Sequence, residues 1–232
     1  EFLPLSAPPG GRIEFIKWIP PLESETLGSY ARRISTLVEP LRPTHLVGVS
    51  FGAAVALEVA RQLKPAPTTV ILIAGPAHAS EWSRMLKLAR RLPAWTLQCL
   101  ISLAFQCAPL YARRWPWFSP RLRALIGCFR MADGAFIRWA LPTLLAWTPP
   151  KSAPRTPPLF RIHGRNDPFF RAHDDHPIRW IPKGGHAITI THRTEVNRFI
   201  QQIIAGHVMH KNFRDEVNEA LPLACSTANP QQ

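Results

Sequence analysis

Short apolar segments alternate with longer amphipathic ones along the first third of the chain. Residues 12–19, 44–49 and 68–74 are rich in β-branched, aromatic and aliphatic side chains, which is typical of strands. Between them, residues 24–38 and 52–63 have the apolar spacing of helices. The segments 44–49 and 68–74 are apolar without alternation, as strands are in parallel sheets covered by helices on both faces. In the helix at 24–38 we expect one buried face, made of Leu27, Tyr30, Ala31, Ile34 and Leu37.

The pattern changes between residues 80 and 148, where no segment has the features of a strand. Its residues predict helices interrupted by prolines, at Pro93, Pro109, Pro116, Pro120 and Pro142. Two short strands at 159–162 and 177–181 and a helix at 195–204 follow.

We therefore predict an α/β fold, with a mostly parallel sheet flanked by helices and interrupted by a helical cap insertion. Its expected parts are 1–79 for the first part of the core, 80–150 for the cap, 151–205 for the second part of the core, and 206–232 for a polar, disordered tail.

Composition narrows the choice of partners. With 232 residues, 46% hydrophobic and 19% charged, the chain suits one domain that buries a core. Its net charge of +13 would favour nucleic acid or an anionic membrane surface, but no nucleic-acid-binding motif accompanies it. We expect no nucleic-acid partner and leave peripheral membrane contact open. The four cysteines show no zinc spacing, so we expect structural free thiols and a reducing, cytoplasmic location.

A G-x-S-x-G motif at Gly48, Ser50 and Gly52 lies between an apolar strand and an Ala-rich helix. The pattern alone arises often by chance, but at a strand-to-helix junction it is typical of a nucleophile elbow. In such a turn the serine has a strained backbone, and the glycines let strand and helix approach closely. We predict that the Ser50 hydroxyl stands above the sheet, next to the first free N–H groups of the helix.

Two further motifs follow the last two predicted strands: HGRND at 163–167 and GGH at 184–186. Asp167 is placed where a carboxylate can orient an imidazole on the next loop. The glycines before His186 allow that loop to bring the ring over Ser50. Singly, Ser50 could be a helix cap, Asp167 a turn former and His186 a surface residue. Asp174 or Asp175 is an alternative acid, further from the strand.

The other histidines are weaker candidates. His163 belongs to the turn before Asp167, and we expect it to be structural. Only 19 residues (186 − 167) separate the acid from His186, so we expect the connection between the last two strands to be short. Of four further histidines, three lack a preceding glycine hinge and strand, and one, His78, lies at the entrance to the insertion; the three are His173, His176 and His192.

GVSFG, HGRND and GGH together resemble the α/β-hydrolase superfamily, over about residues 12–205. The resemblance is strongest to small serine hydrolases with a helical cap, among them carboxylesterases, thioesterases and lipases. It implies Ser50 as nucleophile, His186 as general base and acid, Asp167 as orienting acid, and the N–H of Phe51 as one oxyanion donor. It implies a small-molecule carboxylic ester or thioester as substrate, with no metal and no organic cofactor. The alternative is a non-catalytic α/β-hydrolase-like protein used for binding.

A second oxyanion donor would come from a loop after an earlier strand. Only residues 1–11 precede the first predicted strand, too few for another parallel strand and its crossover. We expect residues 8–11 (PPGG) to be a turn, and the chain to begin after the first strands of a longer protein. The catalytic hypothesis therefore concerns the full-length protein, and this chain alone is expected to hydrolyse p-nitrophenyl esters poorly.

The insertion could cover the elbow as a cap. Its apolar residues could line an acyl pocket or pack on the core: Trp95, Leu97, Leu100, Ile101, Leu103, Ala104, Phe105 and Leu110. Its clustered arginines could hold an anionic thioester carrier, touch membrane lipid or form a solvated surface: Arg90, Arg91, Arg113, Arg114, Arg121 and Arg123.

Overall fold

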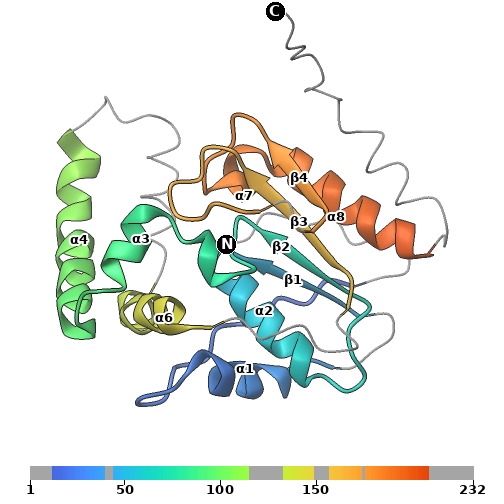
Figure 1. The fold of residues 1–232 in the computed structure, drawn as a ribbon, viewed down its shortest axis with the longest axis horizontal. Coiled ribbons are helices and arrows are strands. Elements are labelled where there is room, and N and C mark those ends of the chain that lie inside the picture. The colour runs from blue at the N-terminus through green and yellow to red at the C-terminus, as the bar shows by residue number, and fades with distance from the viewer. Residues whose placement is uncertain (1–11, 40–43, 115–132, 149–156, 174–175, 209–232) are drawn as a thin grey trace, which may run out of the picture.

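The structure is a computed structural model that describes residues 12–39, 44–114, 133–148, 157–173 and 176–208. Its strands form a sheet in the order β1-β2-β3-β4, in which every neighbouring pair is parallel (Figure 1). The strands are β1 (His45–Val49), β2 (Thr69–Ile73), β3 (Leu159–Gly164) and β4 (Ile178–Ile181). The predicted α/β fold, with a parallel sheet flanked by helices, is confirmed.

Alternate residues of β2 face opposite layers of helices. Ile71 and Ile73 pack with α8 (Arg193–Val208), whereas Val70 and Leu72 pack with α2 (Phe51–Gln62). All residues of β2 are buried. Since both faces of the strand are covered, apolar side chains are needed at every position, and this is why its sequence lacks alternation.

Helix α1 (Leu27–Ser35) begins after Thr26, three residues later than the sequence pattern indicates. The Thr26 hydroxyl accepts the N–H of Ser29 at 3.2 Å, and the Ser29 hydroxyl accepts the N–H of Thr26 at 3.0 Å. This reciprocal capping box fixes the start of the helix. The prediction that Leu37 shares the buried face is wrong, because it lies beyond the last turn and is 50% exposed. The other four predicted residues are buried: Leu27, Tyr30, Ala31 and Ile34.

Residues 12–19 do not form the predicted strand. A strand requires a hydrogen-bonded neighbour, and within the described sheet β1 pairs with β2 and not with this segment. The segment instead lies against helices. The Tyr30 hydroxyl donates to the carbonyl of Ile19 at 3.0 Å, and the Trp18 ring packs on Tyr30 and Phe51. Trp18 therefore packs on α1 and α2, whereas Phe15 of the same segment is 57% exposed.

The described part of the insertion consists of helices without strands, as predicted: η1 (Ala79–Glu81), α3 (Arg84–Ala89), α4 (Ala94–Arg114) and α6 (Gly134–Ala146). Pro93 precedes α4, but the predicted interruptions at Pro109 and Pro142 are wrong, because both prolines lie inside helices. Buried Ala140 and Leu144 flank Pro142, and their packing outweighs the loss of one helical hydrogen bond. Pro116 and Pro120 lie outside the described residues.

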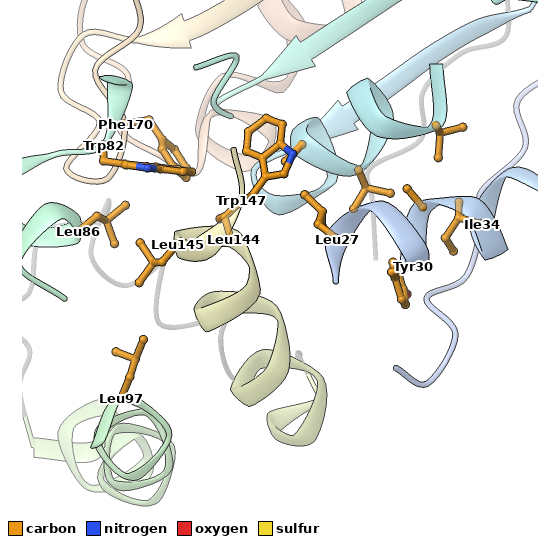
Figure 2. Close-up of a cluster of buried hydrophobic side chains, with 14 of the residues drawn as sticks. Leu27, Tyr30, Ile34, Trp82, Leu86, Leu97, Leu144, Leu145, Trp147 and Phe170 are labelled. Carbon is orange, nitrogen blue, oxygen red and sulfur yellow. The ribbon is translucent and has the colours of Figure 1, made fainter. Parts of the chain in front are cut away.

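A cluster of buried side chains joins the insertion to the core (Figure 2). Leu144 and Leu145 of α6 lie between two groups of side chains, one with Trp82, Leu86 and Phe170 and the other with Leu27, Tyr30 and Ile34 of α1. At the end of α6, the indole N–H of Trp147 donates to a carboxylate oxygen of Glu58 at 2.8 Å. None of the described helices is both long and apolar enough to cross a membrane.

The last two strands are connected without a helix in the described residues between them, as the short spacing predicts. After β4 come α7 (Ile188–Thr191) and α8, which continues two residues past the expected start of the tail at 206. The rest of that predicted tail, 209–232, lies outside the described residues.

Candidate active site

Ser50 forms the turn between β1 and α2, as predicted, and its backbone is left-handed, with φ 53° and ψ −117°. Its N–H donates to the carbonyl of Ile73 at 3.0 Å, which ties the turn to β2. A positive φ is costly for a residue with a side chain and persists only where the surroundings enforce it, often at active sites. The elbow geometry is therefore present.

Two glycines make this turn possible, and only one of them belongs to the motif. A Cβ at Gly48 would clash with the carbonyl of Gly52 and lie 2.7 Å from the Cα of Ala53. A Cβ at Gly75 would clash with the Ala53 side chain and lie 2.7 Å from the Ser50 carbonyl oxygen. At Gly52 a Cβ would meet its nearest atom, on Trp18, at an ordinary 3.5 Å. Close packing therefore requires Gly48 and Gly75, whereas space does not require Gly52.

The three predicted residues Ser50, Asp167 and His186 lie together. Ser50 Oγ is 2.9 Å from His186 Nε2, and His186 Nδ1 is 2.9 Å from Asp167 Oδ2. Since a carboxylate only accepts, Nδ1 carries the proton, and Nε2 is left to accept the hydroxyl proton. A continuous donor–acceptor chain thus runs from the hydroxyl to the carboxylate.

Backbone contacts hold the loop of His186 against the end of β3. The N–H of Arg165 donates to the Ile181 carbonyl at 3.0 Å, and the N–H of Asn166 donates to the Gly184 carbonyl at 2.9 Å. The ring of Phe169 meets the His186 imidazole edge-on, with centroids 4.9 Å apart. The side chain of His186 is 13% exposed, so the imidazole is packed but open to solvent at one side.

The carboxylate of Asp167 is buried and surrounded by donors. Its Oδ1 accepts the N–H groups of Phe169 at 2.8 Å and Phe170 at 3.2 Å. Its Oδ2 faces both His186 and His163, whose Nε2 is 3.1 Å away. Burial alone would raise the pKa of Asp167, but the hydrogen bonds of His163 and His186 outweigh burial and hold this pKa well below its ordinary range. Asp167 is therefore ionised throughout the neutral range.

Comparison with known proteins places the chain in a family. Its residues 11–199 match the family described as alpha/beta hydrolase. The chain belongs to the alpha/beta hydrolase family. The resemblance inferred from the three motifs is thereby confirmed. A comparison with curated proteins gives no match.

Solved structures share the alpha/beta hydrolase fold of this chain at low identity. BpoC of Mycobacterium tuberculosis, described as a candidate non-heme bromoperoxidase, is 18% identical, with a TM-score of 0.58 over 80% of this chain and 76% of that chain. A thermophilic esterase of Thermogutta terrifontis is 17% identical, with a TM-score of 0.52 over 79% and 73%. A candidate aryl esterase of Burkholderia cenocepacia is 15% identical, with a TM-score of 0.51 over 80% and 73%. These likenesses establish the fold.

The other residues expected at this site include an oxyanion donor, alternative acids and the turn at residues 8–11. Phe51, the predicted oxyanion donor, is the first residue of α2, where an N–H has no partner within the helix. Asp174, Asp175 and residues 8–11 lie outside the described residues. Within the described residues, no group of three His, Cys, Asp or Glu side chains could hold a metal ion.

Sequence reasoning misplaced His163, which lies within β3 and not in the turn before the acid. Its side chain is buried and directed at the Asp167 carboxylate. His163 lies two residues after Arg161 and therefore on the same face of β3, and in the structure both side chains are buried; the sequence itself carries no local signal that this polar face points inward.

The predicted lining of the cap divides into two groups. Leu97 and Ile101 are buried, whereas Trp95, Leu100 and Leu103 are exposed. The side chains of the remaining three predicted lining residues lie outside the described part of the structure: Ala104, Phe105 and Leu110. The expected structural role of the cysteines does not hold for Cys99, which is exposed; Cys107 is partly buried, and both are free thiols. Cys128 and Cys225 fall outside the described residues.

Proposed function

We propose that this protein is a serine hydrolase that cleaves carboxylic esters or thioesters through an acyl-enzyme. Ser50 is the nucleophile, His186 the general base and then acid, and Asp167 the orienting carboxylate. The observation that carries the proposal is the hydrogen-bonded chain of two 2.9 Å contacts that begins at a serine held with positive φ. A structural serine cap would require neither that backbone nor an imidazole acceptor.

In the first half of the reaction, Ser50 Oγ attacks the carbonyl carbon while its proton passes to His186 Nε2. The new imidazolium is stabilised by Asp167, which already accepts the Nδ1–H and is ionised because its pKa is low. His186 then protonates the leaving alcohol or thiol, and the acyl group remains on Ser50. In the second half, water loses a proton to His186 and attacks the acyl carbon, which releases the acid and restores the hydroxyl.

The tetrahedral oxyanion needs donors beside Ser50. The N–H of Phe51 is suitably placed at the start of α2, where the positive end of the helix dipole also favours negative charge. Small-molecule esters and acyl thioesters are the proposed substrates, and esterases among the solved structures of this fold support a carbonyl substrate.

A fluorophosphonate probe tests the proposal directly, because it reacts only with an activated serine. We expect the protein to be labelled, and labelling to disappear in Ser50→Ala. Ser102→Ala, at a hydroxyl inside α4 that donates to the carbonyl of Gln98, is the matched control and should label like the parent. Hydrolysis of p-nitrophenyl butyrate and of butyrylthiocholine then separates oxygen esters from thioesters.

If neither labelling nor hydrolysis depends on Ser50, the proposal is wrong. A protein that binds an ester without turnover, unchanged by Ser50→Ala, would instead be a non-catalytic binding protein of the same fold.

A further inference from the structure

Asp167 has a second imidazole partner that the proposed reaction does not use. His163 Nε2 lies 3.1 Å from Oδ2, the oxygen that also accepts the Nδ1–H of His186. The side chains of His163 and Asp167 are each 1% exposed, so water does not compete for this contact.

The neighbours of His163 Nε2 determine whether this nitrogen carries a proton. Besides Asp167 Oδ2, this nitrogen lies 3.3 Å from the carbonyl oxygen of Phe170, and both groups can only accept. Nε2 is therefore protonated and donates. The imidazole ring lies on β3 in a T-shaped contact with the Trp180 ring, with an angle of 72° between the two planes and centroids 5.9 Å apart.

Building on the proposed function, we propose that His163 is a positioning residue that fixes the Asp167 carboxylate in the orientation that accepts the proton of His186. Phe169 and Phe170 hold Oδ1 through their N–H groups, and His163 holds Oδ2 from the buried side. With four donors on its two oxygens, the carboxylate cannot rotate away when the imidazolium forms.

Paired variants distinguish positioning from mere packing. His163→Phe keeps a planar ring but removes the donor, and we expect kcat for p-nitrophenyl butyrate to fall about ten- to a hundred-fold with KM nearly unchanged. His163→Gln retains an N–H at the place of Nε2 and should restore most of kcat. His192→Phe, at a partly exposed histidine bonded to the Thr191 hydroxyl, is the control and should act like the parent.

A second measurement does not depend on activity. In a carboxyl NMR titration, His163→Phe should raise the pKa of Asp167, whereas His163→Gln should keep it low, since the donor that stabilises the carboxylate is kept. An unchanged Asp167 pKa and an unchanged kcat in His163→Phe would overturn the inference. If Ser50→Ala shows that the protein is not a serine hydrolase, the titration still decides whether His163 holds Asp167.

The insertion contains a strongly basic segment. Residues 82–132 contain nine Lys or Arg and no Asp or Glu, so this segment carries most of the net charge of +13. Within it, residues 94–107 of α4 contain no charged residue at all. In Figure 1 this helix stands at the outer edge of the molecule, away from the sheet.

The uncharged part of α4, residues 94–107, presents apolar side chains to solvent. Trp95 is 68% exposed and Leu103 is 57% exposed, on the side of α4 opposite the buried Leu97. On the neighbouring α3, Leu88 is 63% exposed. We call the following residues the cap surface: exposed apolar Met85, Leu88, Trp95, Leu100 and Leu103, with exposed basic Arg84, Lys87, Arg90 and Arg91.

We infer that the cap surface binds peripherally to an anionic lipid bilayer. Exposed Trp and Leu beside Lys and Arg, with no acidic residue, is the composition that places a helix in the headgroup region of such a membrane. A second copy of the chain would present the same uncompensated cations and be repelled, which argues against self-association through this surface.

Flotation of the protein with vesicles tests this inference. We expect binding to vesicles of equal parts phosphatidylcholine and phosphatidylglycerol, loss of that binding at high salt, and no binding to phosphatidylcholine alone. Reversing Lys87, Arg90 and Arg91 to Glu together should weaken partitioning at least about a hundred-fold, since the loss of each cation alone contributes about five-fold and the added carboxylates are repelled. Trp95→Ser should weaken it roughly ten-fold.

Matched controls lie on the core. Arg179→Glu with Lys183→Glu removes exposed cations away from the insertion, and Leu22→Ser removes a 58% exposed leucine. Both should bind like the parent. The inference is overturned if neither vesicle floats the protein, if the control variants lose as much binding as the cap-surface variants, or if sedimentation shows a dimer that the cap-surface variants dissociate.

Discussion

Two buried carboxylates, Asp167 and Glu81, are each held by a side chain of β3. Arg161 and His163 lie two residues apart and therefore on the same face of that strand. Arg161 grips Glu81 with two contacts, Nη1 to Oε1 at 2.6 Å and Nη2 to Oε2 at 2.8 Å. The backbone N–H groups of Ala77 and His173 also donate to the Glu81 carboxylate. Backbone N–H groups donate to Asp167 in the same way.

The difference between the two clusters lies in their partners. Burial would raise the pKa of Glu81, but the hydrogen bonds and charge of Arg161 hold that pKa below its ordinary value. A guanidinium keeps its charge at every working pH, whereas an imidazole gains and loses a proton near neutrality. Glu81 is thus compensated permanently, while Asp167 has a partner that can become cationic during a reaction. The pair of Arg161 and Glu81, which we call the anchor, therefore suits a structural role. The arrangement around Asp167 suits proton transfer.

The anchor also supports the site. Residues 81–83 run antiparallel to residues 169–171: the N–H of Arg171 donates to the Glu81 carbonyl at 2.7 Å, and the N–H of Ser83 donates to the Phe169 carbonyl at 2.9 Å. Phe169 and Phe170 in turn supply the N–H groups on Asp167. The entrance of the insertion and the proposed acid are therefore one connected structure.

The largest expected effect separates the two carboxylates by activity. Asp167→Asn removes the negative charge that stabilises the imidazolium. Because the N–H groups of Phe169 and Phe170 retain the amide oxygen, it also turns an NH2 donor toward His186 Nδ1, and kcat for p-nitrophenyl butyrate should fall about 10⁴-fold. Glu81→Gln, which keeps a hydrogen-bond acceptor at the anchor, should lower kcat less than ten-fold. Equal losses in the two variants, measured with folded protein, would show that the clusters do not differ in role.

The second prediction concerns the contribution of the Arg161–Glu81 pair to stability. Arg161→Met leaves Glu81 charged and buried without a cation, which should cost about 3–5 kcal/mol of unfolding free energy in urea titrations. Adding Glu81→Gln should recover part of this loss, because no buried charge then remains.

Arg12→Met is the matched control for that prediction. Arg12 pairs with Glu39 at 2.7 Å, but the two side chains are 59% and 65% exposed, so water can replace the lost partner. The expected cost is below about 1 kcal/mol. A cost at Arg12 as large as that at Arg161 would mean that burial does not distinguish these ion pairs.

Sequence patterns predict those parts of this protein that depend on neighbouring residues. Continuous apolar runs located β1 and β2 within one residue, and the strand–helix junction located Ser50. The segment 12–19 misled because a strand pattern does not say whether a hydrogen-bonding partner is present. The anchor escaped prediction for a similar reason, since Glu81 and Arg161 are 80 residues apart and neither has a local signal for the other.

Acid titration compares the two carboxylates by a third measurement. Both have lowered pKa values in the folded protein, so below about pH 4 the unfolded chain binds more protons than the folded one. Their stabilisation is fully present above that range and is lost as the pH falls through the folded values. The unfolding free energy should therefore decrease on acidification by up to about 1.4 kcal/mol per pH unit for each carboxylate. Asp167→Asn, and separately Glu81→Gln with Arg161→Met, should each make this dependence shallower; unchanged slopes would refute the assignment.

The smallest expected effect tests whether anchor and site are coupled through Phe170. Its ring packs on Trp82 with centroids 5.5 Å apart and on His186 at 5.6 Å, and it is buried. Phe170→Leu keeps the backbone N–H to Asp167 but loses both aromatic contacts, so we expect about 0.5–1.5 kcal/mol of lost stability. Because the loop whose N–H groups donate to Asp167 is then less firmly held, kcat should also fall by roughly two- to five-fold, a loss of less than about 1 kcal/mol in transition-state stabilisation.

Phe15→Leu, at a side chain 57% exposed on the surface, serves as the control and should change neither stability nor kcat. A loss of stability in Phe170→Leu without any change in kcat would show that residues 81–83 are fastened to the core independently of the proposed acid.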